Sequence, residues 1–240
     1  MNNDNAIHLG IIPDGNRRWA KSRSLNPWKG HEQAIENFKA LTEWCRNDER
    51  ISVMTVWCFS TENWKRERQE IDMLMKMLED YLRKEQESFI ENKTKFCHSG
   101  RKDRIPSSLA ELIKEVEEKT FDQTDFTLHL AVDYGGRDEI ERAVEKKCHG
   151  EPCRTMTQPM SSFNRAQDDI NIRSYLDHPE LPDIDIIIRT SGEKRTSNFF
   201  LWQAAYAEWI FEDKLFPDFE VRDLEKAVSD YEHRGRRYGS

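Results

Sequence analysis

The run Ile-Ser-Val-Met-Thr-Val-Trp-Cys-Phe at Ile51–Phe59 is the strongest indication of the fold. It is nearly all apolar and contains no charged residue, which is typical of a strand that is covered on both faces. Strands of this kind occur in parallel sheets with helices packed on the two faces. We therefore expect Ile51–Phe59 to be a strand of a mostly parallel sheet.

On both sides of this run, short apolar segments alternate with segments of helical periodicity, which favours an α/β fold. Further strands are predicted at Ile7–Ile12, Lys95–Ser99, Phe126–Val132, Ile184–Ile188 and Glu208–Phe211. Helices are predicted around Ile35–Cys45, Ile71–Leu82, Leu109–Val116 and Val221–Glu232. The least periodic stretch, Gly150–Asp183, is expected to be a lid or an irregular surface segment. We expect one domain over residues 1–240, with a central sheet of about six strands flanked by helices.

The composition is polar and acidic but rich in aromatic residues. With 37 Lys and Arg against 45 Asp and Glu, the net charge is −8, and only 37% of the residues are hydrophobic. The mean hydropathy of −0.88 approaches that of disordered chains. Seven Trp, 12 Phe and six Tyr indicate a folded core instead. The acidic balance argues against a general nucleic-acid-binding protein.

The sequence also bears on location. Its long uncharged stretches, such as Ile51–Thr61, are much shorter than the roughly 20 residues of a membrane-spanning helix. Met1–Gly10 shows no basic region followed by an apolar core, so no secretory signal is predicted. The five scattered cysteines are expected to be reduced thiols in a cytoplasmic protein. Cys148-His149 with Cys153 has no second ligand pair, which argues against structural zinc there.

Polar residues with ligand-binding chemistry follow the first predicted strand. Asp14, Gly15 and Arg18 come directly after Ile7–Ile12. In open α/β sheets, ligands bind beyond the carboxyl ends of the strands. Arg18 could therefore bind phosphate oxygens and Asp14 could hold Mg²⁺, with Gly15 allowing close approach of the backbone. The alternative is that Pro-Asp-Gly-Asn is only a turn.

Two more strand ends carry similar groups. Ser60–Arg66 follows the second strand, where Ser-Thr-Glu could also be the cap of the helix that contains Ile71. Arg189–Asn198 combines arginine, lysine and hydroxyl groups, which suit a second diphosphate. Glu208 stands in an apolar stretch and is expected to be an ion-pair partner or a metal ligand. No GxxxxGK[ST], GxGxxG or GxSxG motif is present, which argues against P-loop and dinucleotide-binding proteins and serine hydrolases.

Taken in order, these segments resemble the cis-prenyltransferases, the undecaprenyl diphosphate synthase family. The resemblance covers most of the chain, from His8 to the C-terminus, and predicts the fold of that family with an apolar tunnel. The matching blocks are HLGIIPDGNRRWA (His8–Ala20), the pair Gly30-His31, FSTENWKR (Phe59–Arg66), DYGGR (Asp133–Arg137) and RTSGEKRTSNFFLWQ (Arg189–Gln203). Arg237-Tyr238-Gly239 resembles the Arg-x-Gly tail that reaches the active site of a partner subunit in this family.

The resemblance implies a reaction. An allylic diphosphate ionises, isopentenyl diphosphate adds through its double bond, and loss of a proton gives a new cis double bond. By matching position, Asp14 would handle Mg²⁺ and Asn63 would aid proton removal. The allylic diphosphate would be bound by Gly15, Asn16, Arg17, Arg18, Trp19, His31 and Arg66. Isopentenyl diphosphate would be bound by Arg189, Arg195, Ser197, Arg237 and Gly239, and Glu208 would complete the Mg²⁺ site, from across a homodimer interface.

The chain departs from the family pattern at several positions. Pro27 replaces an arginine that clamps the allylic diphosphate, and Arg23, Lys29 or Arg17 could substitute for it. Asp133 replaces an asparagine, and Ser99–Lys102 lacks the usual Ile-Gly-Asp. An altered clamp would be consistent with a short product or with head-to-middle coupling of isoprene units.

The resulting prediction is a Mg²⁺-dependent cis-prenyltransferase that makes a (Z)-polyprenyl diphosphate of short to medium length. The expected partners are isopentenyl diphosphate, an allylic prenyl diphosphate and a second copy of the chain, with no nucleic acid. Transient membrane contact would arise through the lipid product. The alternatives are head-to-middle coupling and a non-catalytic subunit of a heteromeric synthase.

Overall fold

A six-stranded, entirely parallel sheet lies at the centre of a computed structural model that describes residues 6–149 and 171–233. The strand order is β3-β4-β2-β1-β5-β6. The strands are β1 (Ile7–Ile12), β2 (Ile51–Ser60), β3 (Thr94–Ser99), β4 (Phe126–Tyr134), β5 (Ile186–Arg189) and β6 (Glu208–Phe211). The prediction of a single-domain α/β fold with about six strands is confirmed.

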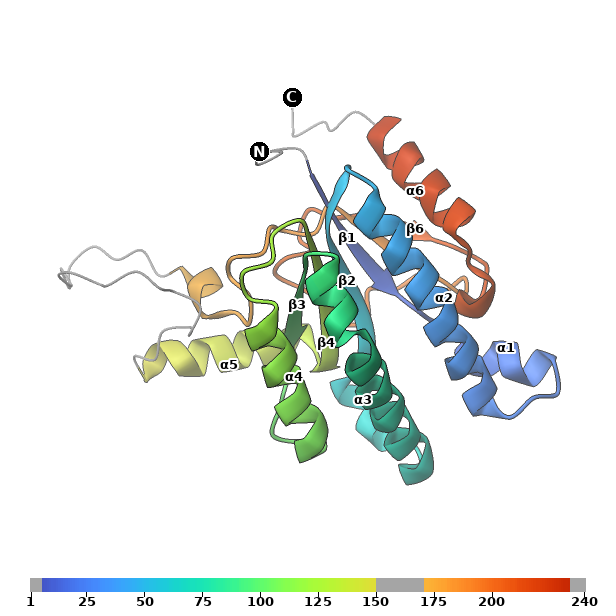
Figure 1. The fold of residues 1–240 in the computed structure, drawn as a ribbon, viewed down its shortest axis with the longest axis horizontal. Coiled ribbons are helices and arrows are strands. Elements are labelled where there is room, and N and C mark those ends of the chain that lie inside the picture. The colour runs from blue at the N-terminus through green and yellow to red at the C-terminus, as the bar shows by residue number, and fades with distance from the viewer. Residues whose placement is uncertain (1–5, 150–170, 234–240) are drawn as a thin grey trace.

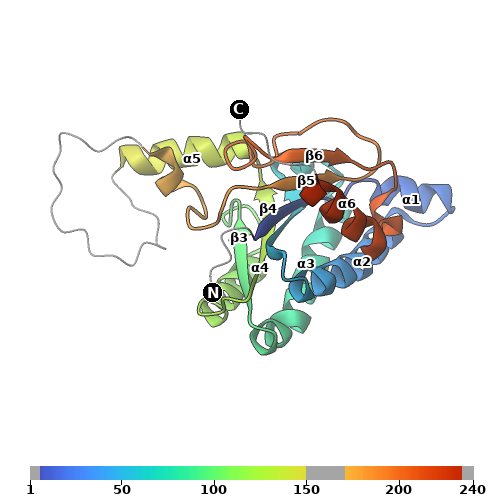
Figure 2. The same ribbon diagram turned by 90° about the horizontal axis from the view of Figure 1, so that it is seen from above.

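Helices cover both faces of this sheet (Figure 1). They are α1 (Asn16–Ser22), α2 (Pro27–Asn47), α3 (Arg68–Glu91), α4 (Ser107–Lys119), α5 (Gly136–Cys148) and α6 (Val221–His233). Viewed from above, α2, α3 and α4 lie on one side of the sheet and α5 lies on the other (Figure 2). The larger apolar core joins α2, α3, α4 and α6 to the sheet, and a smaller one packs Phe199 and Phe200 against the opposite face.

The strand order reverses at β1, which pairs with β2 on one side and β5 on the other. Such a reversal leaves a crevice beyond the carboxyl ends of the strands, where α/β proteins bind their ligands. The residues after β1, β2 and β5 therefore meet at one edge of the sheet. These are the three segments for which the sequence predicts ligand-binding residues.

The four predicted helices are present, but the short α1 and the longer α5 were not among them. The reason α5 escaped is visible in its sequence. Its buried residues are Gly136, Glu139 and Ala143, so it shows no apolar period. Glu139 is 1% exposed, and its carboxylate accepts hydrogen bonds from Tyr134 Oη (2.6 Å) and Gln203 Nε2 (3.1 Å). A charged residue on the buried side of a helix hides that helix from a search for hydrophobic periodicity.

Three short 3-10 helices complete the described residues, at Thr61–Lys65 (η1), Ile172–Tyr175 (η2) and Phe216–Asp218 (η3). Ser60 is the N-cap of η1, whereas the long helix that contains Ile71 begins after Glu67. The prediction that Ser60 caps that long helix is therefore wrong. Of the irregular stretch 150–183, residues 150–170 lie outside the described residues, and the remainder contains only η2. Across the described ranges, no helix has the length and apolar character needed to cross a bilayer.

Candidate active site

A polar cleft of ≈ 680 Å³ opens at the carboxyl ends of β1, β2 and β5. Its walls hold carboxylate, amide, hydroxyl and guanidinium groups from segments more than a hundred residues apart in the sequence. The predicted site residues that it brings together are Asp14, Asn16, His31, Asn63, Arg66, Arg189, Arg195 and Ser197. The structure thus assembles members of all three predicted segments in one place.

The Asp14–Arg189 ion pair lies in the floor of this cleft. Arg189 is 4% exposed, and its Nη2 donates to Asp14 Oδ2 at 2.9 Å. Its Nη1 donates to Arg195 O and Ser197 Oγ, both at 2.7 Å, while Nε has no hydrogen-bond partner among the described residues. The arginine therefore holds the loop after β5 in place and presents a fixed positive charge beside a carboxylate.

The turn after β1 places Asp14 beside Arg189. Gly15 has a φ of 102°, and its N–H donates to Asp14 Oδ1 at 2.7 Å. A Cβ atom at Gly15 would lie 2.8 Å from Leu215 Cδ2, so the turn requires glycine for space as well as for its backbone angle. Thr190 Oγ1 donates to Asp14 O at 2.8 Å and accepts from Asp14 N at 2.9 Å. The backbone of Asp14 is thereby tied to the end of β5.

A second set of basic side chains surrounds Glu70 of α3. Arg66 Nη1 lies 3.0 Å from Glu70 Oε1, and Arg17 Nη1 lies 3.6 Å from Glu70 Oε2. His31 Nε2 is 3.8 Å from Glu70 Oε1 and has no hydrogen-bond partner in the described part of the chain. Glu70 was not predicted as a site residue, although its i, i+4 spacing from Arg66 was a usable signal. Its carboxylate accepts a hydrogen bond from Arg66 and lies beside Arg17 and His31.

His31 reaches this position because α1 packs directly on α2. A Cβ atom at Gly30 would lie 2.0 Å from Asn16 O, so only glycine allows the two helices to come this close. Burial lowers the pKa of His31 to about 4, against the opposing effect of Glu70. The imidazole is therefore neutral at neutral pH and can donate or accept one hydrogen bond at Nε2.

The structure discriminates between the three residues that could replace the clamp arginine lost at Pro27. Arg23 stacks on Trp19 at 4.3 Å and pairs with Asp218 at 3.1 Å. Lys29 pairs with Glu32 at 2.6 Å. Arg17 alone of the three contacts Glu70, next to Arg66 and His31. Arg17 is therefore the residue best placed to substitute for the missing clamp.

Other predicted site residues lie outside the cleft lining, among them Gly15 and Arg17, described above. Trp19 Nε1 donates to Asp218 Oδ1 at 2.7 Å, and Arg18 Nη2 donates to Ser191 O at 3.1 Å while also pairing with Glu193. Glu208 starts β6 opposite Ile186, whereas the cleft lies beyond Arg189. Three residues of extended strand span about 10 Å, so one chain does not bring Glu208 to Asp14. Arg237 and Gly239 lie outside the described residues.

The short helix η1 supplies two further polar groups to the cleft. Asn63 Oδ1 accepts a hydrogen bond from Ser60 N at 3.1 Å, which fixes the asparagine side chain. Glu62, which was not predicted as a site residue, faces Asn198 Nδ2 at 3.4 Å. Although burial opposes this, hydrogen bonds from its own backbone N–H, Ser60, Thr61 and Asn198 lower the pKa of Glu62. These hydrogen bonds hold Glu62 in its ionised form in the cleft that also contains Asp14.

Asp133 holds the short helix η1 in place through Trp64. It has a left-handed φ of 51° and a completely buried carboxylate, which accepts from Trp64 Nε1 at 2.7 Å. Arg104 donates to the same carboxylate through Nη2 at 2.6 Å and Nε at 2.8 Å. At the position where the family that this sequence resembles has an asparagine, this chain has Asp133, and the charge of its carboxylate is paired with Arg104. The loop 99–102, the other unusual segment, contacts it through the bond from Arg101 N to Asp133 O at 3.1 Å.

We expect Asp133→Ala to lower the free energy of unfolding by about 3 kcal/mol, because Trp64 and Arg104 lose a buried acceptor. Asp133→Asn keeps one acceptor and tolerates the left-handed backbone, so a loss of about 1 kcal/mol is expected. Urea unfolding measures both. Asp125→Ala, which removes an exposed partner of Lys93, is the control and should change stability by less than about 0.5 kcal/mol. Equal losses for Asp133→Ala and the control would contradict the anchoring role.

An apolar pocket of ≈ 90 Å³ adjoins the cleft and shares Pro13, Asn16, His31, Cys58 and Leu74 with it. Its walls come from β2, α2 and α3. The α2 residues are Ala34, Ile35 and Phe38. Cys58 and Met77 also line this pocket, whereas Met73 on α3 is 41% exposed and does not.

Comparison with known proteins decides the family of this chain. Residues 12–239 match the family model described as "Putative undecaprenyl diphosphate synthase". The chain belongs to the undecaprenyl diphosphate synthase family. An isoprenyl transferase of Helicobacter pylori is 39% identical over 238 residues, covering 98% of both chains. An isoprenyl transferase of Treponema denticola is 38% identical over 237 residues, covering 99% of both.

Two solved structures have the same fold. Lavandulyl diphosphate synthase from Lavandula x intermedia, in complex with dimethylallyl diphosphate, superposes with a TM-score of 0.85 and is 34% identical, covering 98% of this chain and 99% of its own. A probable undecaprenyl diphosphate synthase from Campylobacter jejuni has a TM-score of 0.77 and 32% identity, with full coverage of both chains. Membership in the undecaprenyl diphosphate synthase family makes this protein a prenyltransferase.

Proposed function

We propose that this prenyltransferase joins isopentenyl diphosphate to a short allylic diphosphate in a Mg²⁺-dependent reaction and releases a (Z)-prenyl diphosphate of short to medium length. The observation that supports this most directly is the arrangement of the cleft. It presents Arg66 on one wall and Arg189 with Arg195 on another, with Asp14 and an apolar pocket adjoining them. Two basic groups suit two diphosphates, and the apolar pocket suits a prenyl chain.

The residues around Asp14 fit Mg²⁺. This ion binds in proteins through one or two carboxylates together with substrate phosphates. The Asp14 side chain is 36% exposed and lines the cleft next to Arg189, so one oxygen can bind a cation while the pair persists. Mg²⁺ held there would supply neutralisation of the charge that builds up on a departing diphosphate.

The protein groups have distinct tasks in the proposed reaction. Arg17 and Arg66 bind the allylic diphosphate, and the pocket beyond His31 takes its prenyl chain away from water. Arg195 and Ser197 bind the diphosphate of isopentenyl diphosphate, positioned by Arg189. The allylic C–O bond breaks, a carbon–carbon bond forms, and a proton leaves near Asn63. Because Arg189 and Ser197 are already fixed by hydrogen bonds, little reorganisation accompanies this charge movement.

We further propose a homodimer in which Arg237, Gly239 and Glu208 act on the active site of the partner. The placement of Glu208 at the opposite end of β6 supports this, because within one chain it cannot share a cation with Asp14. The cytoplasmic location and the membrane contact through the lipid product stay predictions.

Head-to-middle coupling of two dimethylallyl units is the second candidate. It is favoured by the structural similarity to lavandulyl diphosphate synthase in complex with dimethylallyl diphosphate, by Pro27 in place of the clamp arginine, and by the small apolar pocket. A non-catalytic subunit is disfavoured, since Asp14, Arg66, Arg189 and Arg195 all reach one cleft.

One assay tests these proposals. Purified protein is incubated with labelled isopentenyl diphosphate and, in turn, with dimethylallyl, geranyl, farnesyl and geranylgeranyl diphosphate, with Mg²⁺ or with EDTA. Chromatographic sizing, mass spectrometry and NMR identify the products. We expect linear (Z)-products with Mg²⁺ only. A branched product from dimethylallyl diphosphate alone would establish the second candidate, and turnover that persists in EDTA would overturn the metal requirement.

A further inference from the structure

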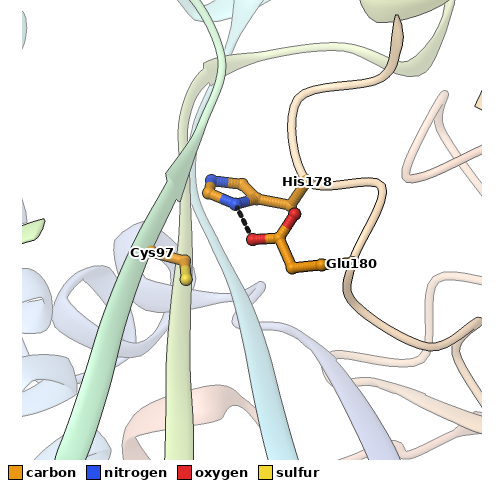
Figure 3. A group of neighbouring side chains, drawn as sticks. All are labelled: Cys97, His178 and Glu180. Atoms are coloured by element: carbon orange, nitrogen blue, oxygen red, sulfur yellow. Dashed lines mark hydrogen bonds and ion pairs between the residues drawn. The ribbon is translucent and has the colours of Figure 1, made fainter. Parts of the chain in front are cut away.

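Cys97, His178 and Glu180 form a cluster away from the cleft. Cys97 belongs to the edge strand β3, and the other two residues belong to the segment between η2 and β5 (Figure 3). Each offers one ligand atom, and the three atoms lie within 4.8 Å of one another. None of the three lines the cleft or the apolar pocket. Cys97 and His178 are 81 positions apart in the chain (178 − 97), so only the fold brings them together.

The hydrogen bonds of His178 leave one ring nitrogen facing an anion. Nε2 lies 3.0 Å from the carbonyl oxygen of His98, which can only accept, so Nε2 carries a proton. Nδ1 lies 2.9 Å from Glu180 Oε1. In a neutral imidazole, Nδ1 would then direct a lone pair at a carboxylate. The site therefore requires a positive species at Nδ1, either a second proton or a metal ion.

Other charged groups lie close to this cluster. Glu117 Oε1 lies 4.0 Å from Nε2 of His178, and Lys95 Nζ lies 3.8 Å from Glu180 Oε1, so the Glu180 carboxylate also pairs with one half-buried lysine.

The donor set is that of a transition metal rather than of Mg²⁺. A thiolate, an imidazole and a carboxylate suit Zn²⁺, whereas Mg²⁺ prefers oxygen ligands alone. A ring N–H that donates to a backbone carbonyl is the usual support of a metal-binding histidine, and His98 O provides it. Tetrahedral zinc places its ligand atoms about 3.4 Å apart. The side chain of Glu180 is 32% exposed, so its carboxylate can move to reach this separation from the other two ligand atoms.

We propose that Cys97, His178 and Glu180 bind one Zn²⁺ ion, with a fourth position open to water. The Cys97 thiol gives up its proton on binding and the ion takes the place of any proton at Nδ1 of His178, so the thiolate and the carboxylate balance the charge of the ion. The ion ties β3 to the segment that leads into β5 and Arg189. This metal site is separate from the Mg²⁺ site at Asp14 and does not depend on the proposed reaction.

Cobalt titration tests the proposal. Full-length protein is freed of metal with a chelator, and Co²⁺ is added under reducing conditions. We expect one Co²⁺ per chain, a thiolate-to-cobalt charge-transfer band, and the intense visible absorption of tetrahedral cobalt. Stoichiometric Zn²⁺ should abolish both, and a large excess of Mg²⁺ should not. Zn²⁺ should also raise the Tm of the protein by several degrees.

Matched variants identify the ligands. Cys97→Ser should remove the charge-transfer band, and Glu180→Gln should weaken Co²⁺ binding at least tenfold while the metal-free Tm changes little. Cys148→Ser, at an exposed free cysteine, should leave the spectrum unchanged. Absence of a charge-transfer band in the unmodified protein would overturn the proposal, as would a band that survives in Cys97→Ser. If Cys97→Ser does not fold, unchanged Co²⁺ affinity in Glu180→Gln would overturn it equally.

Discussion

Asp14→Asn should lower kcat about 10³-fold or more, which corresponds to about 4 kcal/mol of transition-state stabilisation. The amide keeps the size of the side chain and can still accept the hydrogen bond from Arg189, but it has lost the negative charge that attracts Mg²⁺. A single preorganised donor at a developing charge contributes about 10²–10³-fold, and removal of a metal ligand is expected to reach the upper end of that range.

The measurement separates chemistry from folding. Steady-state turnover with isopentenyl diphosphate and the best primer gives kcat, and urea unfolding shows whether the variant is intact. Asp72→Asn is the matched control, because Asp72 lies on α3, is exposed and, within residues 6–149 and 171–233, forms an ion pair only with Arg68. It should keep kcat within about twofold, as expected for an exposed residue away from the site. Turnover of Asp14→Asn within tenfold of the unmodified protein would remove Asp14 from the centre of the site.

Stability should fall steeply between about pH 6.5 and pH 4, because four histidines are buried in neutral form. Burial lowers the pKa of His8 and His31 to about 4 and that of His98 to about 3, and it holds that of His129 well below its ordinary value. Below pH 6.5 the unfolded chain takes up protons that the folded chain does not, so acid favours unfolding. Each histidine contributes about 1.4 kcal/mol per pH unit, or about 5 kcal/mol per unit for the four together.

The buried contacts explain why these rings stay neutral. His8 and His129 both bond to Thr55 Oγ1, at 2.6 and 2.9 Å, and His129 continues to Ser99 Oγ at 2.7 Å. The chain of hydrogen bonds crosses four strands without a carboxylate in it. The pKa of His178 is raised instead, so its effect on the pH dependence of stability has the opposite sign. Its contribution to stability is fully present below pH 6.5 and is lost as the pH rises through the pKa of His178 in the folded protein.

Urea unfolding followed by tryptophan fluorescence at pH 7.5, 6 and 5 measures this slope. His98→Asn should reduce it by about a quarter, because one of the four groups is removed. His233→Asn, at an exposed position on α6, should leave it unchanged. A free energy of unfolding that is constant within about 1 kcal/mol from pH 6.5 to pH 5 would show that the rings take up protons in the folded state.

Much of the fold follows from local patterns. The apolar runs at Ile7–Ile12 and Ile51–Phe59 became β1 and β2 almost residue for residue, because a strand buried on both faces leaves a continuous apolar signal. α5 was missed because Glu139 occupies its buried side. That Asp14, Arg66 and Arg189 lie near one another could be predicted because each stands at or soon after the carboxyl end of a strand, where parallel sheets place their ligands.

By itself, the sequence determined the α/β class, the strands, the three polar segments at their carboxyl ends and, through its motifs, the family. The tertiary structure alone decided which charged and polar side chains lie beside one another. Glu70 gathers Arg17, Arg66 and His31, Asp133 joins Trp64 to Arg104, and Cys97 meets His178 and Glu180. The physical reason is the distance along the chain over which each effect acts. Strand and helix periodicity act between neighbours in the chain, whereas a buried charge selects its partners through space, from whatever residues the strand order brings beside it.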